Sequence, residues 1–212
     1  MKMKTIDLTH MISNDMPVYP GDEPPQIKAV GSIETDGFHE SRIALSSHTG
    51  THVDAPAHIL PYSPFLDRIP LDCFIGRCSM IDLTALTMPA VHLADLNPHE
   101  FLFQNSEFVL LHTGWSRFWG QDKYFRGFPV LSIEAALWVH SFNLKGLGID
   151  TPSIDEVNST DFPIHKILLE RLLIVENLTN LDKLPRTGFT FSCFPLKMEK
   201  VDGSPVRAVA II

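Results

Sequence analysis

Three imidazoles and one carboxylate stand within eleven residues of this chain, in the segment His-Thr-Gly-Thr-His-Val-Asp-Ala-Pro-Ala-His that runs from His48 to His58. His48 and His52 are four positions apart, which would place both on one face of a helix. A helix is disfavoured, however, because Gly50 weakens it, the β-branched residues are stiff, and Pro56 cannot stand in a helix interior. The segment is therefore predicted to be extended as far as Pro56.

An extended segment directs alternate side chains to the same face, so His48, His52 and Asp54 are expected to point the same way. Gly50 would lie on that face and leave room for an ion, and the loop after the proline could bring His58 back to the same pocket. A lone histidine on an apolar strand is usually structural. Four convergent groups of ligand type instead favour a metal such as Zn²⁺, Mn²⁺ or Fe²⁺, and three protein ligands would leave one coordination position for water.

Length and composition are those of a small enzyme. The 212 residues suffice for one core and no linker divides them, so a single domain over residues 1–212 is expected. The net charge of -8 disfavours a nucleic-acid partner. The three cysteines include no C-x-x-C pair, and no apolar stretch has signal-peptide or membrane length, which predicts a cytoplasmic protein without a membrane partner.

Strands are predicted to alternate with a few helices, as in α/β proteins. Ser132 is a good N-cap for a helix over residues 133–142, and Thr160 or Asp161 can cap a helix with Pro163 in its first turn that ends near Arg171. Strands are expected at residues 5–9, 26–33, 41–48, 77–83, 107–113, 144–150, 172–178, 187–197 and 206–211.

Polar residues in the second half form another candidate group. Glu176 ends an apolar strand, where an ionised carboxylate needs a partner. That partner can be His165, brought close by the turn from helix to strand, or merely a backbone amide or an arginine. Asp150 and Asp155 follow a predicted strand, where a functional site and an Asx-turn or helix cap explain them equally well.

The pattern His-x-Gly-Thr-His-x-Asp-x-Pro-x-His resembles the cyclase-like metal-dependent hydrolases, a family that includes bacterial kynurenine formamidase and isatin hydrolase. The resemblance implies a swivelling β/β/α fold and one or two divalent ions, Zn²⁺ or Mn²⁺, per subunit. It implies that His48, His52 and Asp54 hold one ion, and that Asp54, His165 and Glu176 hold the other. It continues through Ile6–His10, Met16–Asp22, Thr113–Trp115, Gly148–Asp150, Ser153, Asp155, His165 and Glu176.

The resemblance also implies an activity: hydrolysis of an aryl formamide, such as N-formyl-L-kynurenine, to the arylamine and formate in tryptophan catabolism. A bound ion lowers the pKa of its water to around 7, and His58 would act as general base and acid, unless it is a further ligand or only orients Asp54. Tyr19 aligns with a substrate-contacting aromatic position, where kynurenine formamidases usually have tryptophan, unless it only packs in its proline-rich loop.

Two rival functions stay open: hydrolysis of a cyclic amide or lactone, and metal-stabilised binding without catalysis. The family implies a homodimer or homotetramer, which the apolar segment Phe101–Phe103 permits. His10 and His39 could line the pocket, but they are expected to face solvent or to pack in loops. Trp115 and Trp119 are expected to make core or dimer contacts rather than to hold substrate.

Overall fold

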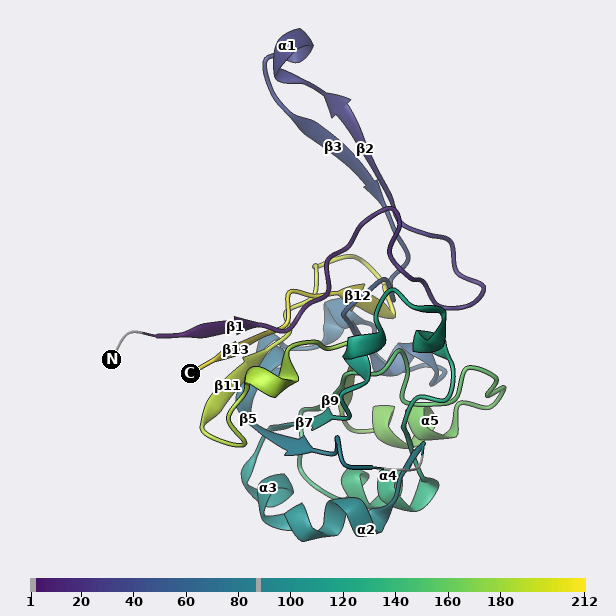
Figure 1. The fold of residues 1–212 in the computed structure, drawn as a ribbon, viewed down its shortest axis with the longest axis vertical. Coiled ribbons are helices and arrows are strands. Elements are labelled where there is room, and N and C mark those ends of the chain that lie inside the picture. Colours follow the sequence, from purple (N-terminus) through teal and green to yellow (C-terminus); the bar gives the residue numbers. More distant parts are fainter. Residues whose placement is uncertain (1–2, 87–88) are drawn as a thin grey trace.

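The computed structural model describes residues 3–86 and 89–212, which form a curled nine-stranded mixed sheet. Apart from one short helix at the tip of a projecting hairpin, the α-helices gather at one end of the molecule (Figure 1). This architecture confirms the α/β prediction. The four central strands β5, β7, β9 and β10 are parallel, and the strands on both sides of them are antiparallel. In sheet order the strands are β1 (Thr5–Asp7), β13 (Val209–Ile211), β11 (Phe189–Ser192), β5 (Ile75–Asp82), β7 (Phe108–His112), β9 (Gly146–Ile149), β10 (Leu173–Glu176), β4 (His52–Asp54) and β12 (Gly203–Pro205).

Most residues of the central strands are apolar and buried because both faces of the sheet are covered. On one face Leu147 and Ile174 pack with the helices, and on the other face Leu110 and Val175 belong to a separate core. Gly148 allows close packing at the centre, since a Cβ there would lie 2.5 Å from Leu110 Cδ2. The sheet is thus a rigid support for residues at its strand ends.

The helices confirm one sequence prediction and correct another. Ser132 caps α4 (Ile133–His140) by accepting a hydrogen bond from the Ala135 amide at 3.2 Å. Neither Thr160 nor Asp161 caps α5 (Pro163–Leu169), because Phe162 holds the N-cap position with a left-handed φ of 46°. Neither α2 (Leu93–Leu96) nor α3 (Glu100–Asn105) was expected from the sequence.

Among residues 3–86 and 89–212, no helix combines the length and apolar character required to cross a bilayer. Outside the main sheet, β6 (Ala90–Val91) and β8 (Val130–Leu131) form a small parallel pair. The predicted strand at residues 206–211 is only partly right. Its second half forms β13, whereas the chain just before it forms β12, which was not predicted.

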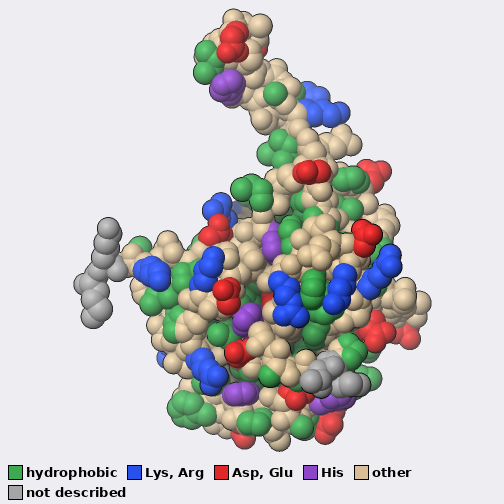
Figure 2. Space-filling model, in the orientation of Figure 1, with side chains coloured by type: hydrophobic (Ala, Val, Ile, Leu, Met, Phe, Trp, Pro, Cys, Tyr) green, Lys and Arg blue, Asp and Glu red, His purple; other side chains and the backbone are tan. Residues whose placement is uncertain are grey.

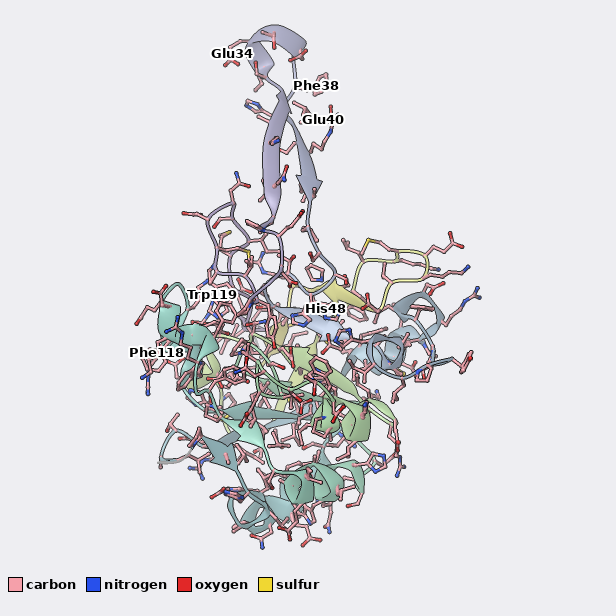
Figure 3. All side chains as sticks on the ribbon, turned by 90° about the vertical axis from the view of Figure 1, so that its right-hand side faces the viewer. Glu34, Phe38, Glu40, His48, Phe118 and Trp119 are labelled. Carbon is pink, nitrogen blue, oxygen red and sulfur yellow. The ribbon has the colours of Figure 1, made fainter. Side chains whose placement is uncertain are left out.

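A two-stranded hairpin projects from the body of the protein (Figures 1 and 3). It consists of β2 (Gln26–Gly31) and β3 (Glu40–Ala44), joined by the short helix α1 (Ile33–Asp36). The strand predicted at residues 41–48 therefore ends early, and the chain returns to the body before His48. Every residue of β3 is exposed, and Figure 2 shows hydrophobic and charged side chains interspersed along the hairpin.

Candidate metal centre

Strand β4 carries His52 and Asp54 between two antiparallel neighbours. In the register with β10, Glu176 lies opposite His52, and in the register with β12, Gly203 lies opposite Asp54. Paired residues in a sheet share a face, so Glu176 joins the two motif side chains on one side of the sheet. All three of these side chains are buried.

His48 reaches this group from a turn, not from the strand. Gly50 has a φ of +66°, a conformation that glycine adopts without strain, and β4 begins only at His52. The predicted role of Gly50, an open position on a strand face, is therefore wrong. Its carbonyl oxygen instead accepts hydrogen bonds from His52 Nδ1 at 2.8 Å and from Asn177 Nδ2 at 3.0 Å.

Two sets of donor atoms meet at Asp54. The ligating atoms of His48, His52 and Asp54 lie within 4.8 Å of one another, and so do those of Asp54, His165 and Glu176. Both carboxylate oxygens of Asp54 are buried and have no hydrogen-bond partner among the described residues. His48 Nδ1 is 2.8 Å from Asp54 Oδ1, but not in hydrogen-bonding geometry. Such a set of imidazole nitrogens around an unsatisfied carboxylate fits a divalent cation.

The outer nitrogen of each buried imidazole is fixed by an acceptor. His52 donates to the Gly50 carbonyl, and His165 Nδ1 donates to Asp155 Oδ2 at 2.7 Å. The other nitrogen, Nε2, therefore faces the carboxylates in both rings: it is 3.2 Å from Asp54 Oδ1 in His52 and 3.3 Å from Glu176 Oε1 in His165. Outer acceptors of this kind orient metal-binding histidines and fix their tautomer.

Asp155 has a second contact, which makes it a helix cap as well as the acceptor for His165. Its carboxylate accepts the backbone amides of Ile164 at 3.1 Å and His165 at 3.0 Å, so it caps the start of α5 from a preceding loop. Asp150 has a structural role too, since its Oδ1 accepts hydrogen bonds from the Thr113 amide and hydroxyl.

The carboxylates make the imidazoles basic. Burial disfavours the charged ring of His48, but Asp54 and Asp202 outweigh it and raise the pKa of His48 to about 9. Burial is likewise outweighed at His165, where Asp155 and Glu176 raise the pKa to about 10. In turn, the imidazoles of His52 and His48 hold the pKa of Asp54 well below its ordinary value despite burial. Without a cation, protons on these rings balance the buried negative charge.

A cavity of about 210 Å³ opens onto this cluster. His58, in the 3-10 turn Pro56–His58 after β4, lies in its wall with its ring centroid 4.1 Å from that of His48. Tyr19 also lies in the wall, and its hydroxyl donates to the Val157 carbonyl at 3.3 Å. The other residues around the cavity are Pro17, Val18, Asp22, Glu23, Thr49, Gly50, His52, Trp119, Phe125, Pro152, Ser153, Phe162, His165, Glu176 and Asn177.

Trp119 makes the core contact expected of it, with its ring centroid 5.1 Å from that of Tyr124, and it also belongs to the aromatic wall of the cavity. Trp119 lines the cavity, whereas Trp115 is buried and donates its Nε1–H to the Tyr124 carbonyl at 2.8 Å. His10 stacks on Trp119 with ring centroids 3.9 Å apart, which is the loop packing expected of it, and His39 is exposed on the hairpin. Figure 3 shows Trp119 and His48 below the base of the hairpin.

Sequence reasoning missed two side chains at the site. Asn177 has a φ of 57° directly after Glu176, and its side chain joins Gly50 to Tyr124. An Asn after a strand end is a signal for such a left-handed position. Asp202 contacts both His48 and His58. No local pattern indicates this contact, because 144 positions separate Asp202 from His58.

Comparison with known proteins agrees with this geometry. The family model described as "Putative cyclase" matches residues 6–156. A kynurenine formamidase of Bordetella avium (strain 197N) is 32% identical over 210 residues, which cover 96% of this chain and 95% of that protein. Isatin hydrolase A from Labrenzia aggregata, solved with benzyl benzoate, superposes with a TM-score of 0.87 at 26% identity, over 99% of this chain and 94% of that one.

A solved structure named "Potential Metal-Dependent Hydrolase With Cyclase Activity" has a TM-score of 0.84 at 29% identity, over 99% of this chain and 98% of that chain. The chain belongs to the cyclase family. Its relatives and its own donor set together make it a metal-dependent hydrolase that uses a divalent cation.

Gly203→Ala tests the position of His48. A Cβ at residue 203 would lie 2.6 Å from His48 Cε1 and 2.8 Å from Nε2, so the ring must move away from Asp54. We expect the affinity for Zn²⁺, measured by competition with a chelator, to fall about 10- to 100-fold, as for other changes that misorient a ligand. Gly31→Ala is the control, because its nearest atom is in the side chain of Phe38 on the exposed hairpin. Unchanged affinity in Gly203→Ala would contradict a ligand role for His48.

Metal uptake should release protons at pH 7. The imidazoles of His48 and His165, with pKa values of about 9 and about 10, are protonated there and must lose protons to bind a cation. Because these values exceed the ordinary 6.5, the protonated rings stabilise the metal-free protein fully below about pH 6.5, and this contribution disappears as the pH rises through 9 to 10. Titration calorimetry in buffers of different ionisation enthalpy measures the number of protons released when the metal binds. Metal binding without proton release would show that the two imidazoles are not protonated at pH 7.

Proposed function

We propose that this protein is an arylformamidase, which hydrolyses an aryl formamide such as N-formyl-L-kynurenine to the arylamine and formate. The observation that carries the proposal is the shared, unsatisfied carboxylate of Asp54 between two ligand sets, with His58 beside them in an aromatic cavity. The identity of 32% to a kynurenine formamidase along nearly the whole chain supports the substrate class. The proposal includes a single domain over residues 1–212, a cytoplasmic location and a role in tryptophan catabolism.

In this proposal His48, His52 and Asp54 hold one Zn²⁺ or Mn²⁺ ion, and Asp54, His165 and Glu176 hold a second. A divalent cation bound there supplies a water molecule acidified toward neutral pH and an electrophile for the carbonyl oxygen. The carboxylate of Asp54 contributes to both sets because each of its oxygens is free. A hydrogen bond at each of the side chains of His52, His165 and Glu176 orients these three groups in advance.

His58 is the general base and acid of the proposed reaction. Its side chain is 27% exposed and lines the cavity, so it can exchange protons with water and meet a substrate. It accepts the proton of the attacking water and delivers it to the departing nitrogen. An anilide nitrogen departs more readily than an alkyl amine, because the ring delocalises its lone pair, and one imidazole then suffices.

The cavity favours a substrate with one aromatic ring. Its volume of about 210 Å³ lies below the roughly 300–1,000 Å³ of pockets for larger ligands. Tyr19 and Trp119 line it, and stacking of an aromatic substrate on such a ring would contribute about 0.5–1.5 kcal/mol beyond burial. Because the Tyr19 hydroxyl is engaged by Val157, we assign Tyr19 to substrate binding through its ring.

A second candidate activity is hydrolysis of a cyclic amide. The TM-score of 0.87 to an isatin hydrolase over 99% of this chain favours it. The same ligand sets and the same base would serve both reactions, since each begins with attack of water on an amide carbonyl. Only the shape of the cavity would determine whether the aryl formamide or the cyclic amide is the better substrate.

Parallel assays of N-formylkynurenine, formanilide and isatin test the proposal. We expect Zn²⁺- or Mn²⁺-loaded protein to hydrolyse the formamides with a higher kcat/KM than isatin. A chelator should abolish turnover and the added metal should restore it. Faster hydrolysis of isatin would select the second candidate. Folded, metal-loaded protein that hydrolyses none of the three would indicate a binding protein and defeat the proposal.

His58→Asn provides the matched variant for this assay. It should keep the metal content of the wild type and lower kcat by about 10²- to 10⁴-fold, the usual contribution of a general base. His99→Asn, distant from the cavity, serves as the control for loss of a histidine. Parallel loss of metal and activity in His58→Asn would identify His58 as a ligand instead.

We further propose that the protein forms a homodimer or homotetramer through the hairpin of β2 and β3. An isolated two-stranded hairpin is only marginally stable in water, yet this one exposes Val30, Ile33, Phe38 and Ile43. A partner surface that covers these side chains would stabilise it. The segment Phe101–Phe103, which the sequence suggested as a subunit interface, is a weaker candidate for that interface because Phe103 is buried in the core.

Phe38→Glu combined with Ile43→Glu should convert the oligomer to monomers, because charged side chains cannot be buried without partners. Light scattering after size exclusion gives the mass. Phe101→Glu changes a side chain that is 71% exposed on α3 and is expected to leave the mass unchanged. Dissociation by Phe101→Glu alone would move the interface to α3.

A further inference from the structure

Asp202 lies beside the motif although it is distant in the sequence. It directly precedes β12, and its backbone carbonyl accepts the Ala55 amide at 2.8 Å, which extends the ladder between β12 and β4. The backbone of Asp202 is therefore fixed relative to the strand that carries His52 and Asp54. Its side chain is 36% exposed and stands at the solvent side of the cluster.

The carboxylate of Asp202 receives three donors. Its Oδ2 lies 3.1 Å from His48 Nε2 and 3.1 Å from His58 Nδ1, and its Oδ1 accepts the Ser47 hydroxyl at 3.0 Å. An ionised carboxylate only accepts hydrogen bonds, so both imidazole nitrogens must carry protons. A carboxylate that is 36% exposed to solvent is ionised at neutral pH.

These contacts determine the free nitrogen in each ring. In His48 the proton on Nε2 leaves Nδ1, the atom 2.8 Å from Asp54 Oδ1, as the lone pair for a cation. In His58 the proton on Nδ1 leaves Nε2 as the basic nitrogen. One carboxylate oxygen thus sets the tautomer of a proposed ligand and of the proposed base together, as an acceptor behind a catalytic histidine does in other hydrolases.

We propose that Asp202 is a positioning residue, which holds the imidazole of His58 in the tautomer that removes a proton from water and links it rigidly to His48. This inference rests on the proposed function, in which His58 is the base. Asp202 itself touches neither substrate nor cation. It acts through the two rings, so its removal should lower both the rate and the affinity for metal, by separate routes.

A double-mutant cycle on kcat tests the route through His58. At saturating metal, Asp202→Asn should lower kcat about 10- to 100-fold, with KM changed less than about threefold. In the His58→Asn background the same substitution should have no further effect, because the ring through which it acts is gone. Effects that multiply in the double variant would overturn the proposal. Glu199→Gln removes one negative charge from an exposed position in the same loop and should retain full kcat.

Nitrogen-15 NMR of the histidine rings tests the tautomer without any substrate. In Zn²⁺-loaded wild-type protein, His58 should be protonated at Nδ1 at a pH where the ring is neutral, and Asp202→Asn should shift it toward a mixture of tautomers. Protonation at Nε2 in the wild type, or no change in the variant, would overturn the proposal even if the enzyme is active. The predicted tautomer in a protein that hydrolyses no amide would support the positioning and refute only the proposed function.

A metal titration tests whether Asp202 is itself a metal ligand. Asp202→Asn should bind as many Zn²⁺ ions as the wild type, with an affinity lower by up to about tenfold through His48. His48, His58 and Asp202 also form a set whose donor atoms lie within 4.8 Å of one another. Loss of one whole equivalent of Zn²⁺ in Asp202→Asn would identify Asp202 as a ligand and overturn its role as a positioning residue.

Discussion

The buried carboxylate of Asp54 is the constraint on which this structure depends. Both of its oxygens are inaccessible and lack a hydrogen-bond donor among the described residues. An isolated buried charge costs far more free energy than any single apolar contact returns. Glu176 adds a second buried carboxylate 3.3 Å from His165. The cluster is stable only if positive charge compensates both groups, either as protons on the imidazoles or as cations.

The sheet explains how these groups can lie so close together. Strand β4 is paired on both edges, so His52 and Asp54 have little freedom, and the register with β10 places Glu176 opposite His52. On the other edge, Gly203 leaves the space that the ring of His48 fills. The site therefore requires the last third of the chain to be folded onto the first. A change in register by one residue would turn these side chains to the opposite face.

The sequence reveals those parts of the structure that depend on local pattern. Apolar runs indicate the central strands, Ser132 marks the start of α4, and the spacing of His52 and Asp54 places them on one strand face. The turn at His48 escapes this reasoning, because Gly50 adopts positive φ within a stretch whose composition is otherwise typical of a strand. Local periodicity contains no information about such a reversal.

Contacts between distant segments are the second kind of feature that the sequence does not reveal. Asp155 caps α5 from a loop, so the expected caps beside the helix are unnecessary. Asp202 meets His58 across 144 positions, and in the sequence it is only an aspartate before Gly203, typical of a turn. The pairing of β12 with β4 creates that contact. The roles of these residues as ligands, base or positioning groups stay predictions until metal and activity are measured.

The residues that line the cavity are the groups that a bound substrate would contact. Glu176, His48, His52 and His165 all line the cavity, whereas Asp54 lies behind them. A cation held by these groups would supply positive charge for a carbonyl oxygen at this wall of the cavity. His58 lines the same cavity. In the proposed reaction, its position beside His48, fixed by their common acceptor, would bring the base to the same cavity as the substrate.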